Sequence, residues 1–278
     1  MIGLIYRASE FSPRDNVQKD AAILEAVGNQ LQQRKQEVVY FKEEDLDEAA
    51  RQTLSSCSIS LSMGRRDKTL TFLQLLKQKG ILVLNAPNAV RVTAQSRSTT
   101  LELLQANGLP VVPFWSYEPS EDCLFQCEPE LQALLPGWIK AMHLRGVSEG
   151  DVRRVNTPLE ADAAVLQFAT NGYSDLIVTR HEEGRLQKLY VVGDCIINLP
   201  DAESVAFAEL VRNIRRTLNL DVWGVDLILT EHGPIIIDVN DFPSFNACRD
   251  VAAPLIADYL MQAAELYIMR NILPEQNG

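Results

Sequence analysis

The chain has 278 residues, of which 46% are hydrophobic and 23% are charged, and its formal net charge at pH 7 is −11. This length accommodates one large domain or about two to three small ones, and the composition is typical of a globular protein. The acidic balance argues against a general nucleic-acid-binding protein, which would carry a basic stripe. An anionic small substrate stays compatible, because a few arginines reverse the field inside a cleft.

Residues 1–86 alternate between strand-like and helix-like patterns. Such a β-α-β alternation indicates a parallel sheet that is covered by helices on both faces. Strands are predicted over Ile2–Tyr6, Glu37–Phe41, Cys57–Met63 and Ile81–Asn85, and helices over Asp15–Gln36 and Asp67–Lys79.

Arginines follow two of the predicted strand ends, at Arg7 and at Arg65 and Arg66. Sheets of this kind bind ligands beyond the carboxyl ends of their strands, and the guanidinium group matches a carboxylate or phosphate. Ordinary exposed arginines and an anion-recognition edge both explain the pattern, and the sequence leaves the two interpretations open.

From Pro87 onward the pattern changes, with no internal repeat or long linker. Helices are predicted over Ser96–Asn107, Pro158–Thr170, Ser204–Leu218 and Val251–Ile272. Between the first two of these, a short strand ends at Lys140 and is followed by the loop Ala141–Asp151, which contains two glycines. Glycines let backbone N–H groups approach phosphate oxygens closely, and lysine adds a point charge. An ordinary hairpin turn is the alternative when the loop is considered alone.

The segment Trp223–Phe245 reads as two apolar strands joined by a turn at residues 231–234. Asp226 lies in the first strand and Asp238 in the second, and Asn240 follows two residues later. Because residues i and i+2 of a strand share a face, Asp238 and Asn240 project together, and a hairpin brings Asp226 within reach. Three oxygen ligands on one face favour Mg²⁺, which takes one or two carboxylates together with substrate phosphates and water.

Solvent-exposed acids at strand ends are the alternative for each aspartate taken singly, since Asp is mostly an exposed residue. An unpaired carboxylate within an apolar strand is costly, however, and a divalent cation would remove that cost. The spacing of the three residues together therefore favours the metal site.

Other kinds of site are not predicted. The five cysteines are scattered, and although Cys123 and Cys127 lie four residues apart, no second Cys or His pair accompanies them, which argues against zinc. His181 and His232 lie in turns rich in Glu and Gly and are predicted to face solvent, whereas His143 is a candidate for a substrate or phosphate contact.

Membrane partners are not predicted either. No window contains the roughly 18 consecutive apolar residues that a membrane span requires. The N-terminal segment lacks both the apolar length and the cleavage site of a signal peptide. We therefore expect a cytoplasmic protein with reduced cysteines.

The hairpin residues resemble the metal-binding end of the ATP-grasp superfamily, in particular its glutathione-synthetase-like ligases. That family carries an acid on the first strand, Glu or Asp on the second and Asn two residues further on, followed by a loop containing Pro. Asp226, Asp238 and Asn240 match these positions one by one. The segment Asn85–Phe114 resembles the start of the family's nucleotide-binding region, with Arg97 in the part where relatives often have lysine.

The resemblance implies an α/β fold class with an N-terminal parallel-sheet pre-ATP-grasp domain and a two-subdomain α+β ATP-grasp fold. The expected divisions are residues 1–86 for the N-terminal domain, 87–178 for the small or lid subdomain and 179–278 for the C-terminal metal-binding subdomain.

The resemblance also implies ATP and Mg²⁺ as cofactors. Lys140 and Lys188 would bind phosphates, and Arg249 would bind the transferred phosphoryl group or the substrate carboxylate. The loop that closes over the phosphates would use Arg145, Gly146 and Ser148. Adenine would meet backbone groups of Val178, Thr179, Arg180 and His181, and Glu182 or Glu183 would hold the ribose.

The reaction implied is that of a carboxylate–amine (or thiol) ligase working through an acyl phosphate on a small-molecule carboxylate. The alternative is a kinase that phosphorylates a hydroxyl acceptor, because Asp238 and the sequence D-V-N-D-F-P-S-F also resemble the metal loop of inositol-phosphate kinases. A nucleotide-binding protein without chemistry is a third class. Self-association into a homo-oligomer is left open.

Overall fold

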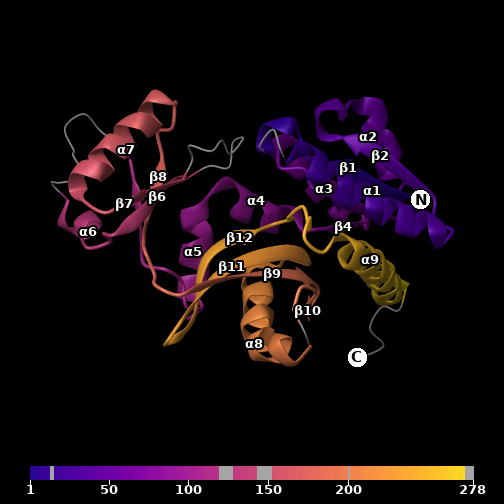
Figure 1. Cartoon of the computed structure of the whole chain (residues 1–278). Coiled ribbons are helices and arrows are strands. Elements are labelled where there is room, and N and C mark those ends of the chain that lie inside the picture. Colours follow the sequence, from indigo (N-terminus) through magenta and orange to yellow (C-terminus); the bar gives the residue numbers. More distant parts are fainter. Residues whose placement is uncertain (13–15, 119–127, 143–151, 200, 273–278) are drawn as a thin grey trace, which may run out of the picture. The chain divides into compact units, whose positions relative to one another are not determined.

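The computed structural model describes residues 1–12, 16–118, 128–142, 152–199 and 201–272. The chain forms two compact units, of which the first comprises Met1–Arg91, Leu189–Gly224 and Asp241–Gly278, and the second comprises Val92–Lys188 and Val225–Asn240. Three four-stranded sheets are present in the described residues, and Figure 1 labels most of their strands. The expected α/β class is confirmed. The predicted three-part division stays a prediction.

The N-terminal sheet is parallel, as predicted. Its order is β2-β1-β3-β4, with Ile2 of β1 opposite Val38 of β2 and Ile59 of β3. The strands are β1 (Ile2–Tyr6), β2 (Val38–Lys42), β3 (Ile59–Ser62) and β4 (Leu82–Leu84). The helices α1 (Val17–Gln33), α2 (Glu48–Ser55) and α3 (Asp67–Gln78) alternate with these strands, together with the 3₁₀ turns Ser9–Phe11 and Glu43–Asp45.

Both faces of this sheet are buried. Leu4 belongs to an apolar cluster that includes Leu24 of α1 and Ile256 of α9 (Arg249–Ile272). Ile5, the next residue, belongs to a second cluster with Leu54 of α2 and Leu73 of α3. Because successive strand residues point to opposite faces, the continuous apolar run of β1 is explained by helices on both sides, and Figure 1 shows α1 beside α9.

The second unit contains an antiparallel sheet of order β5-β8-β6-β7. Its strands are β5 (Phe114–Tyr117), β6 (Gly137–Ala141), β7 (Val152–Val155) and β8 (Leu176–Arg180). The helices along this part of the chain are α4 (Pro87–Gln95), α5 (Arg97–Ala106), α6 (Pro129–Gln132) and α7 (Pro158–Thr170). Phe168 of α7 and Leu131 of α6 are buried in one cluster with Ile139 of β6, so these helices cover the sheet.

The third sheet has the order β10-β9-β11-β12 and contains the predicted hairpin. Its strands are β9 (Arg185–Val192), β10 (Cys195–Ile196), β11 (Val222–Thr230) and β12 (Gly233–Asn240), and α8 (Asp201–Leu218) connects β10 to β11. Residues 231–232 alone join the neighbouring strands β11 and β12, which is a tight hairpin connection. In the part of the chain that the structure describes, no helix is long and apolar enough to cross a bilayer.

Candidate functional site

Two carboxylates on the β11–β12 hairpin repel each other electrostatically. Asp226 of β11 and Asp238 of β12 have side chains that are 21% and 29% exposed. Burial raises the pKa of Asp226, Lys188 opposes this shift, and the Asp238 carboxylate adds to it. Asn240 is half-buried two residues beyond Asp238 in the same strand, so their side chains share a face.

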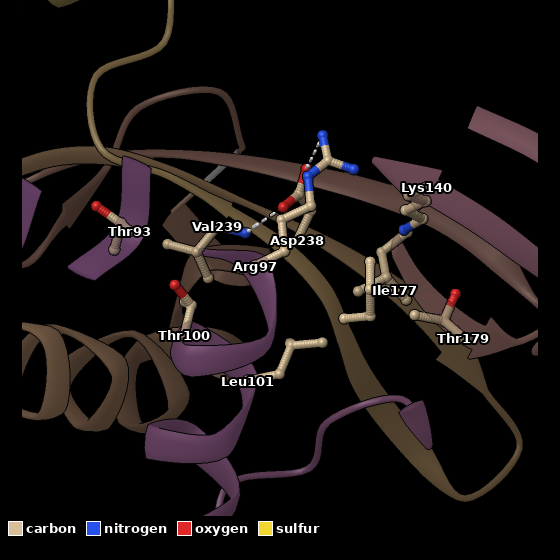
Figure 2. A pocket seen from close by; sticks show the side chains of 10 residues that line it. Thr93, Arg97, Thr100, Leu101, Lys140, Ile177, Thr179, Asp238 and Val239 are labelled. Atoms are coloured by element: carbon tan, nitrogen blue, oxygen red, sulfur yellow. Dashed lines mark hydrogen bonds and ion pairs between the residues drawn. The ribbon is translucent and has the colours of Figure 1, made fainter. Parts of the chain in front are cut away.

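Cationic side chains surround the two carboxylates. Lys188 of β9 places its Nζ 3.2 Å from Asp226 Oδ1. Arg97, the first residue of α5, places its Nη2 4.0 Å from Asp238 Oδ2, and Figure 2 shows its guanidinium group facing that carboxylate. The Arg97 side chain is 12% exposed, and its Nε has no hydrogen-bond partner among the described residues. This guanidinium therefore keeps donor capacity for an anion.

Lys140 of β6 is the third cation. Burial lowers the pKa of its ammonium group, the Asp238 carboxylate opposes this shift, and Arg97 adds to it. Lys140 lines a narrow pocket together with Arg97 and Asp238, as Figure 2 shows. A cation held in this partly desolvated position interacts more strongly with a ligand anion than it would in water.

A larger cavity of about 340 Å³ lies within the second unit, and Lys140, Thr179 and Ile237 line both the cavity and the narrow pocket. Its apolar walls are formed by Trp138, Val152, Leu186, Ile228 and Ile237. Its polar residues are Lys140, Thr179, Arg180, His181 and Glu182. Apolar walls with a few convergent polar groups are typical of a small-molecule site.

Hydrogen bonds fix the side chains after β8. Trp138 Nε1 donates to His181 Nδ1 at 3.2 Å, and His181 Nε2 lies 3.2 Å from the Glu183 carboxylate. Nδ1 therefore accepts from the indole, and Nε2 faces the Glu183 carboxylate. The His181 side chain is only 19% exposed, so the prediction that it faces solvent was wrong, whereas His232 is 87% exposed as predicted. The indole of the sheet residue Trp138 explains the burial of His181.

The backbone after β8 is largely engaged. Val178 is buried in the central strand and pairs with Trp115 of β5 and Ile139 of β6. The Arg180 N–H donates to Pro113 O at 2.9 Å, and the His181 N–H donates to Pro136 O at 2.8 Å. These two N–H groups are therefore not open to an adenine base in this structure.

Side chains supply polar groups near this backbone instead. Arg180 Nε donates to Glu182 Oε1 at 2.8 Å, and the Glu182 side chain is only 12% exposed. Glu183, in contrast, is 90% exposed. Of the two acids predicted to hold ribose, Glu182 is the one that lines the cavity.

Some predicted residues lie elsewhere. Arg145, Gly146, Ser148 and His143 fall outside the described residues; the strands on either side are paired, with Lys140 opposite Val152. Arg249 belongs to the first unit and donates to Asn246 Oδ1 at 3.0 Å.

The arginines after the strands of the first unit form internal ion pairs. Arg7 Nη1 lies 3.0 Å from Asp20 Oδ2, Arg65 pairs with Asp241, and these arginine side chains are 7% and 4% exposed. Arg66 pairs with Glu10 and is 22% exposed. The interpretation of Arg7 and Arg65 as ordinary exposed arginines is therefore wrong. Both guanidinium groups are buried, and each forms an ion pair with a buried aspartate.

The oxygen ligands fit a hard divalent cation. Within the described ranges, no group of three or more His, Cys, Asp or Glu side chains is arranged so that it could hold a metal ion by itself. The hairpin offers two carboxylates and one amide, and an oxygen-only set of this size suits Mg²⁺ completed by phosphate oxygens and water. The raised pKa of Asp226, caused first by burial and also by Asp238, marks a place where a cation would relieve electrostatic strain.

Comparisons with known proteins show where this architecture recurs. No family model and no curated protein matches the chain. Its fold is similar to that of D-alanine–D-alanine ligase from Bacillus anthracis, at 14% identity and a TM-score of 0.74 over 96% of this chain and 98% of that chain. The same ligase complexed with ATP matches at 13% identity and a TM-score of 0.71, over 96% and 98% of the two chains.

A second kind of structure is also similar. The RimK domain ATP-grasp protein from Sphaerobacter thermophilus matches at 20% identity and a TM-score of 0.67, over 94% of this chain and 100% of that chain. These likenesses extend over nearly the whole of each chain. The chain therefore has the ATP-grasp fold.

Proposed function

We propose that this protein is an ATP- and magnesium-dependent carboxylate–amine (or thiol) ligase that works through an acyl phosphate. The main support is the pair Asp226 and Asp238, which lies among Arg97, Lys140 and Lys188 next to a cavity of about 340 Å³. The similar structures include a ligase complexed with ATP, which is consistent with this use of the fold.

The nucleotide base would occupy the cavity, with Trp138, Leu186 and Ile228 as apolar walls. Because the N–H groups of Arg180 and His181 are already engaged, we expect carbonyl groups or side chains to contact the base. Glu182 would accept from the ribose hydroxyls.

The phosphates would extend from the cavity toward the carboxylates. Lys140 lines both the cavity and the narrow pocket, which supports the proposal that it binds the phosphates, while Lys188 and Arg97 flank the two aspartates. The roles of Arg145, Gly146 and Ser148 as a phosphate-covering loop, and of Arg249 toward the acceptor, belong to the proposal on the sequence resemblance alone.

Asp226, Asp238 and Asn240 would hold Mg²⁺, which when bound neutralises charge on the β- and γ-phosphate oxygens. The carboxylate oxygen of the substrate then forms a bond to the γ-phosphorus, and the bond from that phosphorus to the bridging oxygen breaks, releasing ADP. The amine or thiol next attacks the acyl carbon, phosphate leaves, and the nucleophile loses a proton. The part of Arg97 and Lys140 is to orient the phosphates and balance their charge.

A small-molecule kinase is the second candidate, because an aspartate rather than a glutamate occupies position 238, within the sequence D-V-N-D-F-P-S-F. The same residues would hold ATP, but a hydroxyl would be the acceptor. The acceptor, self-association and a cytoplasmic location stay proposals.

Phosphorus NMR separates the two reactions. The protein is incubated with Mg-ATP and candidate acids carrying ¹⁸O in the carboxylate, together with amines or thiols. A ligase releases inorganic phosphate in step with product, and one ¹⁸O atom from the carboxylate appears in that phosphate. A kinase leaves the phosphoryl group on a hydroxyl acceptor and releases no inorganic phosphate, which would exclude the ligase.

A further inference from the structure

The buried side-chain amide of Asn85 forms hydrogen bonds to the backbone at the start of β11 and at the end of β12. Asn85 directly follows β4 and is 1% exposed. Its Oδ1 accepts from the N–H groups of Asp221 at 2.9 Å and Val222 at 2.8 Å. Its Nδ2 donates to Val222 O at 2.7 Å and also to Asp241 O. The side chain thus uses two donor hydrogens and its acceptor oxygen at once.

These contacts lie at the base of the two strands that carry the carboxylates. Val222 is the first residue of β11, four residues before Asp226. Asp241 directly follows β12 and lies three residues after Asp238. Since a strand rises about 3.3 Å per residue, the amide acts on backbone roughly 10–13 Å from each carboxylate. The separation of the strand ends therefore influences the spacing of the two aspartates.

A second set of buried contacts holds the same segment. Asp241 is 1% exposed and accepts from Arg65, whose Nε lies 3.2 Å from Asp241 Oδ2. The next residue, Phe242, accepts at its carbonyl from Arg7 Nη2 at 2.7 Å. Arg7, Arg65 and Asn85 follow the strands β1, β3 and β4, so three neighbouring strand ends contact residues 241–242.

We propose that Asn85 is a positioning residue for the pair Asp226 and Asp238, which rests on the proposed function of that pair as a magnesium site. An amide is suited to this place because it donates to two carbonyls and accepts from two N–H groups in one plane. An aspartate of the same shape keeps the accepting side but opposes two carbonyl oxygens. A network that is buried and satisfied in this way holds its geometry tightly, and a partly satisfied one does not.

The test is the magnesium dependence of ATP binding to the full chain, measured by titration calorimetry without an acceptor. Asn85→Asp is expected to raise the Mg²⁺ concentration for half-maximal ATP binding, by less than the roughly 10–100-fold seen when groups hydrogen-bonded directly to metal ligands are lost. ATP binding without Mg²⁺ is expected to stay at the wild-type level, because the residues that Asn85 holds by hydrogen bonds are not among those that line the cavity.

Two further variants separate positioning from stability. Asn85→Ser is smaller, leaves room for water and is expected to shift the Mg²⁺ dependence in the same direction, which keeps the test valid if Asn85→Asp does not fold. Leu73→Ala, in the buried cluster with Ile5, is expected to lower the melting temperature without moving the Mg²⁺ dependence.

Wild-type Mg²⁺ dependence in a folded Asn85 variant would overturn the proposal, as would an equal shift in Leu73→Ala. If ATP binding to the wild type did not depend on Mg²⁺, the proposed metal site would instead be refuted, together with the role proposed for Asn85. The two failures are distinguishable because the second is seen in the wild type before any variant is made.

Discussion

Burial of the Asp226 side chain disfavours its ionised form. Its pKa is raised from 3.8, first by burial and then by Asp238, although Lys188 opposes the shift. An acid whose pKa is higher in the folded protein than in the unfolded chain binds its proton more tightly when folded. The contribution of such a group to stability is present below pH 3.8 and is lost as the pH rises through the folded-state pKa.

We therefore predict that Asp226→Asn stabilises the metal-free protein at pH 8, by about 0.5–2 kcal/mol, the usual scale when a group under functional strain is replaced. The gain is expected to shrink as the pH falls, because the wild-type carboxylate then becomes protonated and loses its penalty. Urea unfolding in EDTA at pH 8 and near pH 4, close to the ordinary pKa above which that of Asp226 is raised, measures both values. A loss of stability of the same size at both pH values would contradict the electrostatic account of this residue.

At the scale of elements, the hairpin and the parallel sheet were predictable because their signals are local. The apolar runs of β11 and β12, the turn at residues 231–232 and the strand-helix alternation of residues 1–86 each depend on neighbours in the chain. The helix α4 was not predicted, although Pro87 stands at its first position, where proline favours a helix start. The Ser96 side chain accepts from Thr99 N and starts a separate helix, α5.

The start of α5 places Arg97 near Asp238, although the two residues are 141 positions apart in the sequence (238 − 97). The spacing of distant residues is set by the packing of whole elements, so it cannot be read from periodicity.

The residues that form the cavity walls were not predicted, for a similar reason. Leu186 and Ile228 are apolar residues of ordinary strands, and only the sheet arrangement shows that they face a cavity. His181 is likewise buried by a distant indole.

Filling the cavity tests whether these elements form the nucleotide site. Ile228→Trp adds an indole to the wall of a cavity of about 340 Å³ and is expected to weaken ATP binding by at least about tenfold. The free energy of unfolding is expected to change by less than about 1 kcal/mol, because the larger ring enters space rather than packed core. Titration calorimetry and urea unfolding give the two quantities.

Leu159→Trp is the matched control, since Leu159 is 77% exposed on α7. This variant is expected to bind ATP like the wild type. If Ile228→Trp and Leu159→Trp bound ATP with equal affinity, the proposal that the base occupies this cavity would be contradicted.

At the scale of the whole molecule, the net charge of −11 and the local charge near the hairpin have opposite consequences. The overall charge disfavours anions at long range, whereas Arg97, Lys140 and Lys188 supply positive charge where phosphates are proposed to bind. The ATP-grasp fold could be predicted because the hairpin residues that carry the resemblance lie close together and in a fixed order along the chain. The acceptor was not predictable, because acceptor recognition depends on side chains whose spacing the motif does not contain.

The most direct measurement of the central claim is titration calorimetry of ATP binding at several Mg²⁺ concentrations, with the wild type and Asp238→Asn side by side. Asp238→Asn keeps the shape of the side chain and removes one of the two carboxylates of the hairpin. We predict that ATP binding to the wild type tightens with Mg²⁺, and that the variant loses this tightening while it retains the weaker metal-independent binding and its fold. An identical Mg²⁺ dependence in the two proteins would contradict a magnesium–nucleotide site on β11 and β12.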